Sequence, residues 1–361
     1  MQCRDWFWRQ QPGAYRWVPF GSLGCTPRAA ASGPCSGVRG NGAQAATCKS
    51  LCSGWDKGDW CIKEGQACRH PSAVVVTATG EPLAPLHATQ AGGRFDACLR
   101  RMGGGELLFI GDSQTKMVYA ELMRWVGRGR EDPDQLAQRT LQDQASVMED
   151  RFNVTAAYVH VGGLYRVSNQ ADRPSTDLEL MLGALRRRAP RSRAVLLVGL
   201  GMWDLVFSAE RDVVGWFEAR FRWLLTRLLA LAHERYETAD VLVRNMFPSF
   251  RRGGLCGEGE AVDHLVALND GIARSLFGVR DAMPASMRAT LRLHLLDAFN
   301  LSWGRRAEMP AGPEGDGLHW GCMGRSGGGQ CTQELHTGSQ RPDEVSWAAM
   351  QVAMLQACGN Y

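Results

Sequence analysis

The stretch LLFIGDSQTKMVY, residues 107–119, joins an apolar run to a helical pattern through the tripeptide Gly-Asp-Ser. A short apolar run that ends in turn residues is typical of a strand buried on both faces of a sheet. Asp112 and Ser113 then lie where the strand ends and a helix begins. Either residue could cap the helix. Alternatively, Ser113 is a nucleophile whose oxyanion the free N–H groups of the helix start would stabilise. The tripeptide alone favours the cap.

Further apolar runs follow this one, and amphipathic segments separate them. The expected strands cover residues 106–110, 156–161, 194–200, 240–246 and 291–299. The expected helices cover residues 114–126, 176–188, 211–236, 260–277 and 343–357. Because strands and helices alternate, the sequence predicts an α/β fold with a parallel sheet and helices on both faces. Sites in such sheets lie at the carboxyl ends of the strands, where Ser113 is expected.

The overall charge excludes one class of partner. The chain has 361 residues, 45% of them hydrophobic, and a net charge of +4. It contains no run of five or more basic residues. We therefore expect an ordinary globular protein that does not bind nucleic acid.

Cysteine usage divides the chain into two parts. Eight of the 12 cysteines precede residue 100, in a segment that is also rich in Gly, Pro and Ser. We expect residues 1–95 to form an irregular, disulfide-linked region and residues 96–361 to form the α/β domain. A zinc site is the alternative for five residues of the first part. These are Cys48, Cys52, Cys61, Cys68 and His70. They lack paired zinc-knuckle spacing, so disulfides are favoured and no metal is expected.

Two acceptor sequons agree with an oxidising compartment. Asn153-Val-Thr and Asn300-Leu-Ser are glycosylation candidates and indicate the secretory pathway. The N-terminus has no apolar leader, and no stretch reaches 18 apolar residues. Either a longer native chain carries a leader or a membrane anchor, which we favour, or the secretory assignment is wrong.

A serine nucleophile needs a base, and the base needs an orienting group. Of the eight histidines, His319 stands out because Asp316 precedes it by three residues in EGDGLHWGC, before the last expected helix. His160 ends a strand and is a weaker candidate, whereas His294 lies inside an apolar strand and suggests a structural role. The pattern GRSGG at 324–328 matches a nucleophile elbow but lacks the strand and helix that an elbow requires.

Taken in order, LLFIGDS, GLGMWD, LLDAFNLSWGRR and DGLHW resemble the PC-esterase branch of the SGNH/GDSL hydrolase superfamily. That branch includes the trichome birefringence-like polysaccharide O-acetyltransferases of plants and the luminal domains of sialic-acid O-acetyltransferases. The resemblance covers about residues 96–361. It implies a three-layer sandwich around a mostly parallel sheet with flavodoxin-like topology. It also implies a catalytic triad of Ser113, Asp316 and His319.

The sequence departs from the family pattern near the expected oxyanion hole. Gly199 stands where plant members carry an asparagine, so the oxyanion donors would be the Ser113 amide with that of Gly201 or Gly163. Trp203 is a candidate for contact with a sugar ring, although core packing is its alternative role.

Two further departures concern a basic residue and the cysteines. Lys116 replaces the usual arginine three residues after the nucleophile. The cysteine after the histidine is shifted by one residue, and we expect Cys322 to pair with Cys256.

The resemblance implies a serine-dependent O-acetyltransferase, or an esterase, that works through an acyl-serine intermediate. Its partners would be an acetyl-ester donor and a polysaccharide or glycan acceptor, with no cofactor, in the Golgi lumen or outside the cell. The alternative is a non-catalytic glycan-binding or scaffolding protein that retains the fold.

Overall fold

The computed structural model describes residues 15–19, 73–77, 97–127, 150–164, 182–183, 185, 191–202, 204, 213–248, 260–303 and 344–358.

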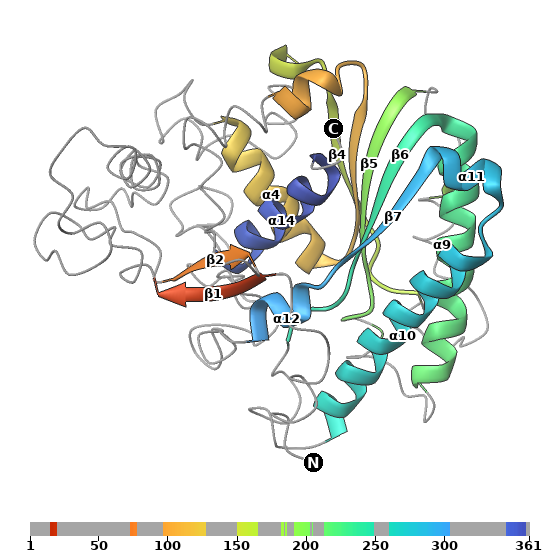
Figure 1. Ribbon diagram of the computed structural model, residues 1–361. Helices are drawn as coiled ribbons and strands as arrows, with labels where there is room; N and C mark the ends of the chain where they lie inside the picture. Colours follow the sequence, from red (N-terminus) through yellow and green to blue (C-terminus); the bar gives the residue numbers. More distant parts are fainter. Residues whose placement is uncertain are drawn as a thin grey trace, which may run out of the picture.

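Five parallel strands form the central sheet of the protein. They are β3 (Glu106–Gly111), β4 (Thr155–His160), β5 (Arg191–Gly199), β6 (Tyr236–Arg244) and β7 (Leu291–Leu296). Their order across the sheet is β4-β3-β5-β6-β7, which is 2-1-3-4-5 in chain order (Figure 1). This is the flavodoxin-like order of doubly wound α/β proteins. The predicted fold class is therefore confirmed, and every described pair of neighbours in this sheet is parallel.

Helices cover both faces of the sheet. Figure 1 shows α4 (Ser113–Gly127) and α14 (Glu344–Cys358) on one side, with α9 (Val213–Arg235) and α10 (Glu260–Ala282) on the other. Alternate residues of β3 point to the two sides: Leu107 joins the core under α4 and α14, and Leu108 joins the core under α9. The result is the predicted three-layer sandwich. Among the described helices, none combines the length and apolar character that crossing a bilayer requires.

The apolar run before Gly-Asp-Ser forms the second strand from one edge of the sheet. All six residues of β3 are buried, and the strand pairs with β4 on one side and β5 on the other. Gly111 is aligned with both His160 and Gly199 across these pairings. Asp112 and Ser113, which follow Gly111, therefore lie between the ends of β4 and β5.

The sequence prediction missed two short helices. The expected strand at 291–299 ends at Leu296, and α12 (Ala298–Trp303) follows. Asp297 separates the two elements, and its Oδ1 accepts a hydrogen bond from the Asn300 N–H, as a helix cap does. The short helix α11 (Ala285–Thr290) before β7 was also not predicted. Both helices are too short to show a helical period in the sequence.

The N-terminal part contains regular structure that the sequence did not predict. The strands β1 (Tyr15–Pro19) and β2 (Ala73–Thr77) form a two-stranded antiparallel sheet. More than 50 residues separate the two strands. Their pairing could not be predicted from the local sequence, which is rich in Gly, Pro, Ser and Cys.

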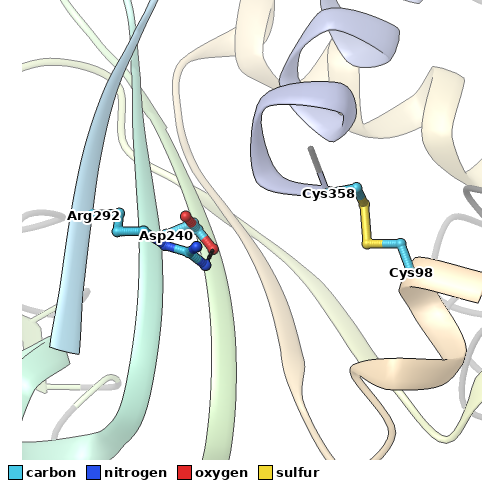
Figure 2. Close-up of a disulfide and its surroundings, with 4 residues drawn as sticks. All are labelled: Cys98, Asp240, Arg292 and Cys358. Atoms are coloured by element: carbon cyan, nitrogen blue, oxygen red, sulfur yellow. Dashed lines mark hydrogen bonds and ion pairs between the residues drawn. A yellow bond between two sulfur atoms is a disulfide. The ribbon is translucent and has the colours of Figure 1, made fainter. Parts of the chain in front are cut away.

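A buried carboxylate joins β6 to the edge strand β7. Asp240 is fully buried and accepts a hydrogen bond of 2.7 Å from Arg292 (Figure 2). The Nε2 atom of His294 lies 3.1 Å from the other carboxylate oxygen. His294 therefore has the structural role that its position in an apolar strand indicated.

A disulfide joins the start of the α/β domain to its last helix. Cys98 lies in the turn of helix before β3, and Cys358 is the last residue of α14 (Figure 2). Their Cα atoms are 5.7 Å apart, a usual separation for a disulfide, although 260 residues separate them in sequence. This bond agrees with the expected oxidised cysteines. Cys256 and Cys322, the pair expected from the sequence, lie outside the described residues.

We expect the double substitution Cys98→Ala with Cys358→Ala to lower the free energy of unfolding by about 4 kcal/mol. The reason is that the bond closes a very long loop of the unfolded chain. Urea titration of the variant and the wild type, with the remaining cysteines kept oxidised, measures the change. A loss below about 1 kcal/mol would contradict this role of the disulfide.

Candidate functional site

Ser113 is the first residue of α4 and lies at the carboxyl end of β3. The chain runs from β3 outward to β4, then crosses back to β5 on the other side of β3. The ends of β3 and β5 thus form the topological switch point, which is where open α/β sheets bind their ligands. Ser113 is partly exposed there, while Asp112, Gln114 and Thr115 around it are buried.

Asp112 caps the helix. Its Oδ1 accepts hydrogen bonds from the N–H groups of Gln114 (3.1 Å) and Thr115 (3.3 Å), and its backbone oxygen accepts one from Lys116. The sequence left open which of the two polar residues caps the helix. Asp112 does so, and a cap at this residue does not exclude the nucleophile interpretation of Ser113.

A buried arginine supports this helix start from the far side of β5. Arg244 ends β6, is fully buried, and donates from Nη2 to Asp112 Oδ1 (3.1 Å) and to Thr115 Oγ1 (3.0 Å). Its Nη1 donates to Gln114 Oε1 at 3.2 Å. Burial lowers the pKa of the Arg244 guanidinium, and the charge of Asp112 opposes that shift. One side chain thereby joins the end of β6 to the first turn of α4.

Sequence reasoning missed Arg244, although a signal was present. In DVLVRNM, Arg244 directly follows three apolar residues of an expected strand. Charged residues are almost never fully buried unless they are paired, so a charge in such a run indicates a buried partner.

The same arginine explains the glycine at position 199. A Cβ atom on Gly199 would lie 2.5 Å from Arg244 Nε and 2.6 Å from Thr115 Oγ1. The Thr115 hydroxyl also donates to the Gly199 carbonyl at 2.8 Å. The space that an asparagine side chain would need is therefore occupied by Arg244 and Thr115, which would have to move to admit one.

Gly163 and Gly201, the other glycines expected from the sequence, lie in the loops that follow β4 and β5. Gly201 has a φ of +122° and is packed so closely that a Cβ atom would lie 2.9 Å from Met246 Sδ. Asp204 joins the two loops, because both of its carboxylate oxygens lie 3.0 Å from the Leu164 N–H that follows Gly163. The structure thus brings both glycines to the carboxyl edge of the sheet.

Tyr158 supports the end of β3 from the opposite side. Its hydroxyl lies 2.9 Å from the Gly111 carbonyl oxygen, 3.1 Å from that of Asp112, and 2.8 Å from His160 Nδ1. Burial raises the pKa of Tyr158, and the charge of Asp112 raises it further. The phenol therefore stays protonated. Through its contact with Tyr158, His160, the weaker histidine candidate, lies beside the strand end that carries Ser113.

A polar network fixes the ends of the last two strands. Asn245, just after β6, donates to Asp297 Oδ1 at 2.7 Å and accepts from the Phe299 N–H at 2.9 Å. The segment FNLSW, which contributed to the family resemblance, therefore starts at the same edge of the sheet.

The remaining predicted site residues divide into two groups. Asp316, His319 and Trp203 lie outside the described residues. The two glycosylation candidates are described: Asn153 is exposed just before β4, whereas Asn300 lies within α12 and donates to Asp297. In the part of the chain that the structure describes, no group of three His, Cys, Asp or Glu side chains is placed to hold a metal ion.

Comparison with known proteins gives one kind of match. No protein-family model matches the chain, and no curated protein matches it. Among solved structures, it is similar to a crystal structure named as a GDSL-like lipase from Parabacteroides merdae ATCC 43184, with a TM-score of 0.37 and 14% sequence identity. The match covers 72% of this chain and 97% of the other. The α/β architecture described above rests on the observed strand order itself.

We expect Arg244→Met to lower the free energy of unfolding by about 3–5 kcal/mol, because the Asp112 carboxylate would stay buried without its partner. Adding Asp112→Asn should recover part of this loss, since asparagine still caps a helix and carries no charge. Chemical denaturation measures both variants. Arg222→Met is the control, because Arg222 pairs with Glu218 at the surface and should contribute less than about 1 kcal/mol. Equal losses for Arg244→Met and Arg222→Met would contradict the importance of the buried pair.

Gly199→Ala should lower the free energy of unfolding by about 1–3 kcal/mol, because the new methyl group would overlap the Arg244 guanidinium. The matched control is Gly278→Ala in α10, where the nearest atom to a new Cβ is 4.0 Å away. That change should stabilise the helix by up to about 1 kcal/mol. Thermal unfolding of both variants tests the comparison, and a neutral Gly199→Ala would be the contrary result.

Proposed function

We propose that the protein is a serine-dependent acyltransferase or esterase of the SGNH/GDSL superfamily, within the PC-esterase branch. The observation that carries the proposal is the position of Ser113. It is the partly exposed first residue of a helix, at the switch point of the sheet, and Asp112 already caps that helix. DGLHW at 316–320 supplies the expected base and its orienting carboxylate.

The reaction would proceed in two steps. His319 takes the proton of Ser113 while Asp316 orients the imidazole, and the serine oxygen attacks the carbonyl carbon of an acetyl ester. The leaving alkoxide takes the proton from His319, which leaves an acetyl-serine. An acceptor hydroxyl then gives its proton to His319 and attacks the acetyl carbonyl, and Ser113 recovers the proton as the new ester departs.

The electrostatics of the helix start suit this chemistry. The helix dipole and its N–H groups favour the negative oxyanion beside Ser113. A lone carboxylate at position 112 would oppose that charge, but the ion pair with Arg244 neutralises it. We assign the oxyanion donors to the amide of Ser113 with that of Gly163 or Gly201, since Gly199 leaves no room for a side-chain donor.

The acceptor distinguishes the two activities. A polysaccharide or glycan hydroxyl makes the protein an O-acetyltransferase, which the family resemblance favours, and water makes it an esterase. A Golgi or secreted location fits the sequons and the disulfide between Cys98 and Cys358. Asn153 is the better glycosylation candidate of the two, because its side chain is exposed outside a helix.

Incubation with p-nitrophenyl acetate followed by intact mass and peptide mapping tests the proposal. We expect one acetyl group on Ser113 in the wild type and none there in Ser113→Ala. Acetylation should be about 10²–10⁴-fold slower in His319→Ala, because the general base is lost. His264→Ala, a change within α10, serves as the control and should acetylate normally.

A wild type that never acetylates at Ser113 would contradict the enzyme and favour the non-catalytic glycan-binding alternative. Turnover with and without an oligosaccharide then separates transfer from hydrolysis.

A further inference from the structure

We propose that His160 is an acceptor-binding residue whose Nε2 receives a hydrogen bond from a hydroxyl group adjacent to the one that attacks, or leaves, the acyl group on Ser113. This inference rests on the proposed function of Ser113. It adds a second imidazole to the site, with a role distinct from that of the expected base His319.

His160 lies at the carboxyl edge of the sheet, next to the end of β3. It is the last residue of β4, the edge strand next to β3, and it is aligned with Gly111. Neighbouring strands are about 4.8 Å apart, and Ser113 follows Gly111 by two residues. His160 is exposed. Its ring is thus available to a molecule bound at the carboxyl edge of the sheet.

The hydrogen bonds of Tyr158 define which ring nitrogen of His160 carries a hydrogen. The Tyr158 hydroxyl carries one hydrogen and lies within hydrogen-bonding distance of two carbonyl oxygens, which only accept. That hydrogen therefore serves the carbonyls of Gly111 and Asp112. The remaining contact, 2.8 Å to His160 Nδ1, then requires that Nδ1 carry the hydrogen and donate to the phenol oxygen.

The tautomer determines what the other ring nitrogen can do. A neutral imidazole with hydrogen on Nδ1 has a lone pair on Nε2 and accepts hydrogen bonds there. Within the described part of the chain, Nε2 of His160 has no hydrogen-bonding partner. An acceptor atom suits a ligand that donates, such as an alcohol or sugar hydroxyl, and it suits carboxylate or phosphate groups poorly. The site is therefore matched to a neutral polyol.

Aromatic packing also holds the Tyr158–His160 pair in place. The Tyr158 ring stacks on that of Tyr119 with centroids 6.0 Å apart, and Tyr119 in turn contacts Phe109 in the core. Burial raises the pKa of Tyr158, so it keeps the hydrogen on which the arrangement depends. A fixed acceptor of this kind orients a hydroxyl without first losing conformational freedom.

The tautomer can be tested without any activity. In long-range ¹H–¹⁵N spectra of the full chain, we expect His160 to show hydrogen on Nδ1 in the wild type. In Tyr158→Phe it should move toward the Nε2–H form. His233 is a matched control, because its Nδ1 lies 2.9 Å from Thr290 Oγ1, which itself donates to a carbonyl. His233 should keep its signals in Tyr158→Phe. An Nε2–H form of His160 in the wild type would overturn the inference.

The acceptor role can be tested with p-nitrophenyl acetate as donor and glycerol as a competing polyol acceptor. Asparagine at position 160 keeps a donor near the Nδ1 position and removes Nε2, whereas glutamine keeps a polar atom near Nε2. We expect His160→Asn to raise the KM for glycerol about tenfold with little change in kcat, as the loss of one hydrogen bond predicts. His160→Gln should stay within about threefold of the wild type, and His233→Asn should match the wild type.

The outcomes separate the two proposals. An acetylated Ser113 together with an unchanged glycerol KM in His160→Asn would overturn the role of His160 alone. A wild type without acetyl-Ser113 would overturn the proposed function, and with it this use of His160, whatever the tautomer.

Discussion

The ion pair between Asp112 and Arg244 is the interaction on which the candidate site depends. Both side chains are fully buried, and their nearest atoms are 3.1 Å apart. Removing one partner from such a pair is far more costly than the pair itself is favourable, because a charge would remain in a medium that cannot solvate it. The pair therefore holds the end of β6 and the start of α4 together, and it determines which residues fit between them. Gly199 is a glycine because the guanidinium occupies the space of a side chain.

The end of β3 is held from both neighbouring sides. Arg244 contacts the Asp112 carboxylate and the Thr115 hydroxyl from β6, and Tyr158 contacts the Gly111 and Asp112 carbonyls from β4. Ser113 lies between these supports as the first residue of the helix. Asp112 thus caps the helix while Arg244 balances its charge, and Ser113 remains partly exposed beside them.

Sequence patterns predicted the central elements well and the short or paired ones poorly. The five strands and four long helices were visible because each is a continuous periodic segment. The helix α12 was hidden, since the apolar residues after Asp297 extended the strand pattern without interruption. The pairing of Cys98 with Cys358 was hidden for another reason. A disulfide depends on which helix packs beside which, and 12 cysteines allow very many pairings.

By itself, the sequence determined the α/β class, the strand before Gly-Asp-Ser and the helix after it, because these follow from local periodicity and turn chemistry. The order of the strands came from the tertiary structure, apart from what a family resemblance implied. That order brings Arg244 to Asp112 across 132 residues and sets His160 beside Gly111. Local sequence patterns predict single strands, but they do not indicate which strands are neighbours in the sheet. Only the folded sheet could therefore show that the serine at the strand end is supported by a buried arginine on one side and a tyrosine–histidine pair on the other.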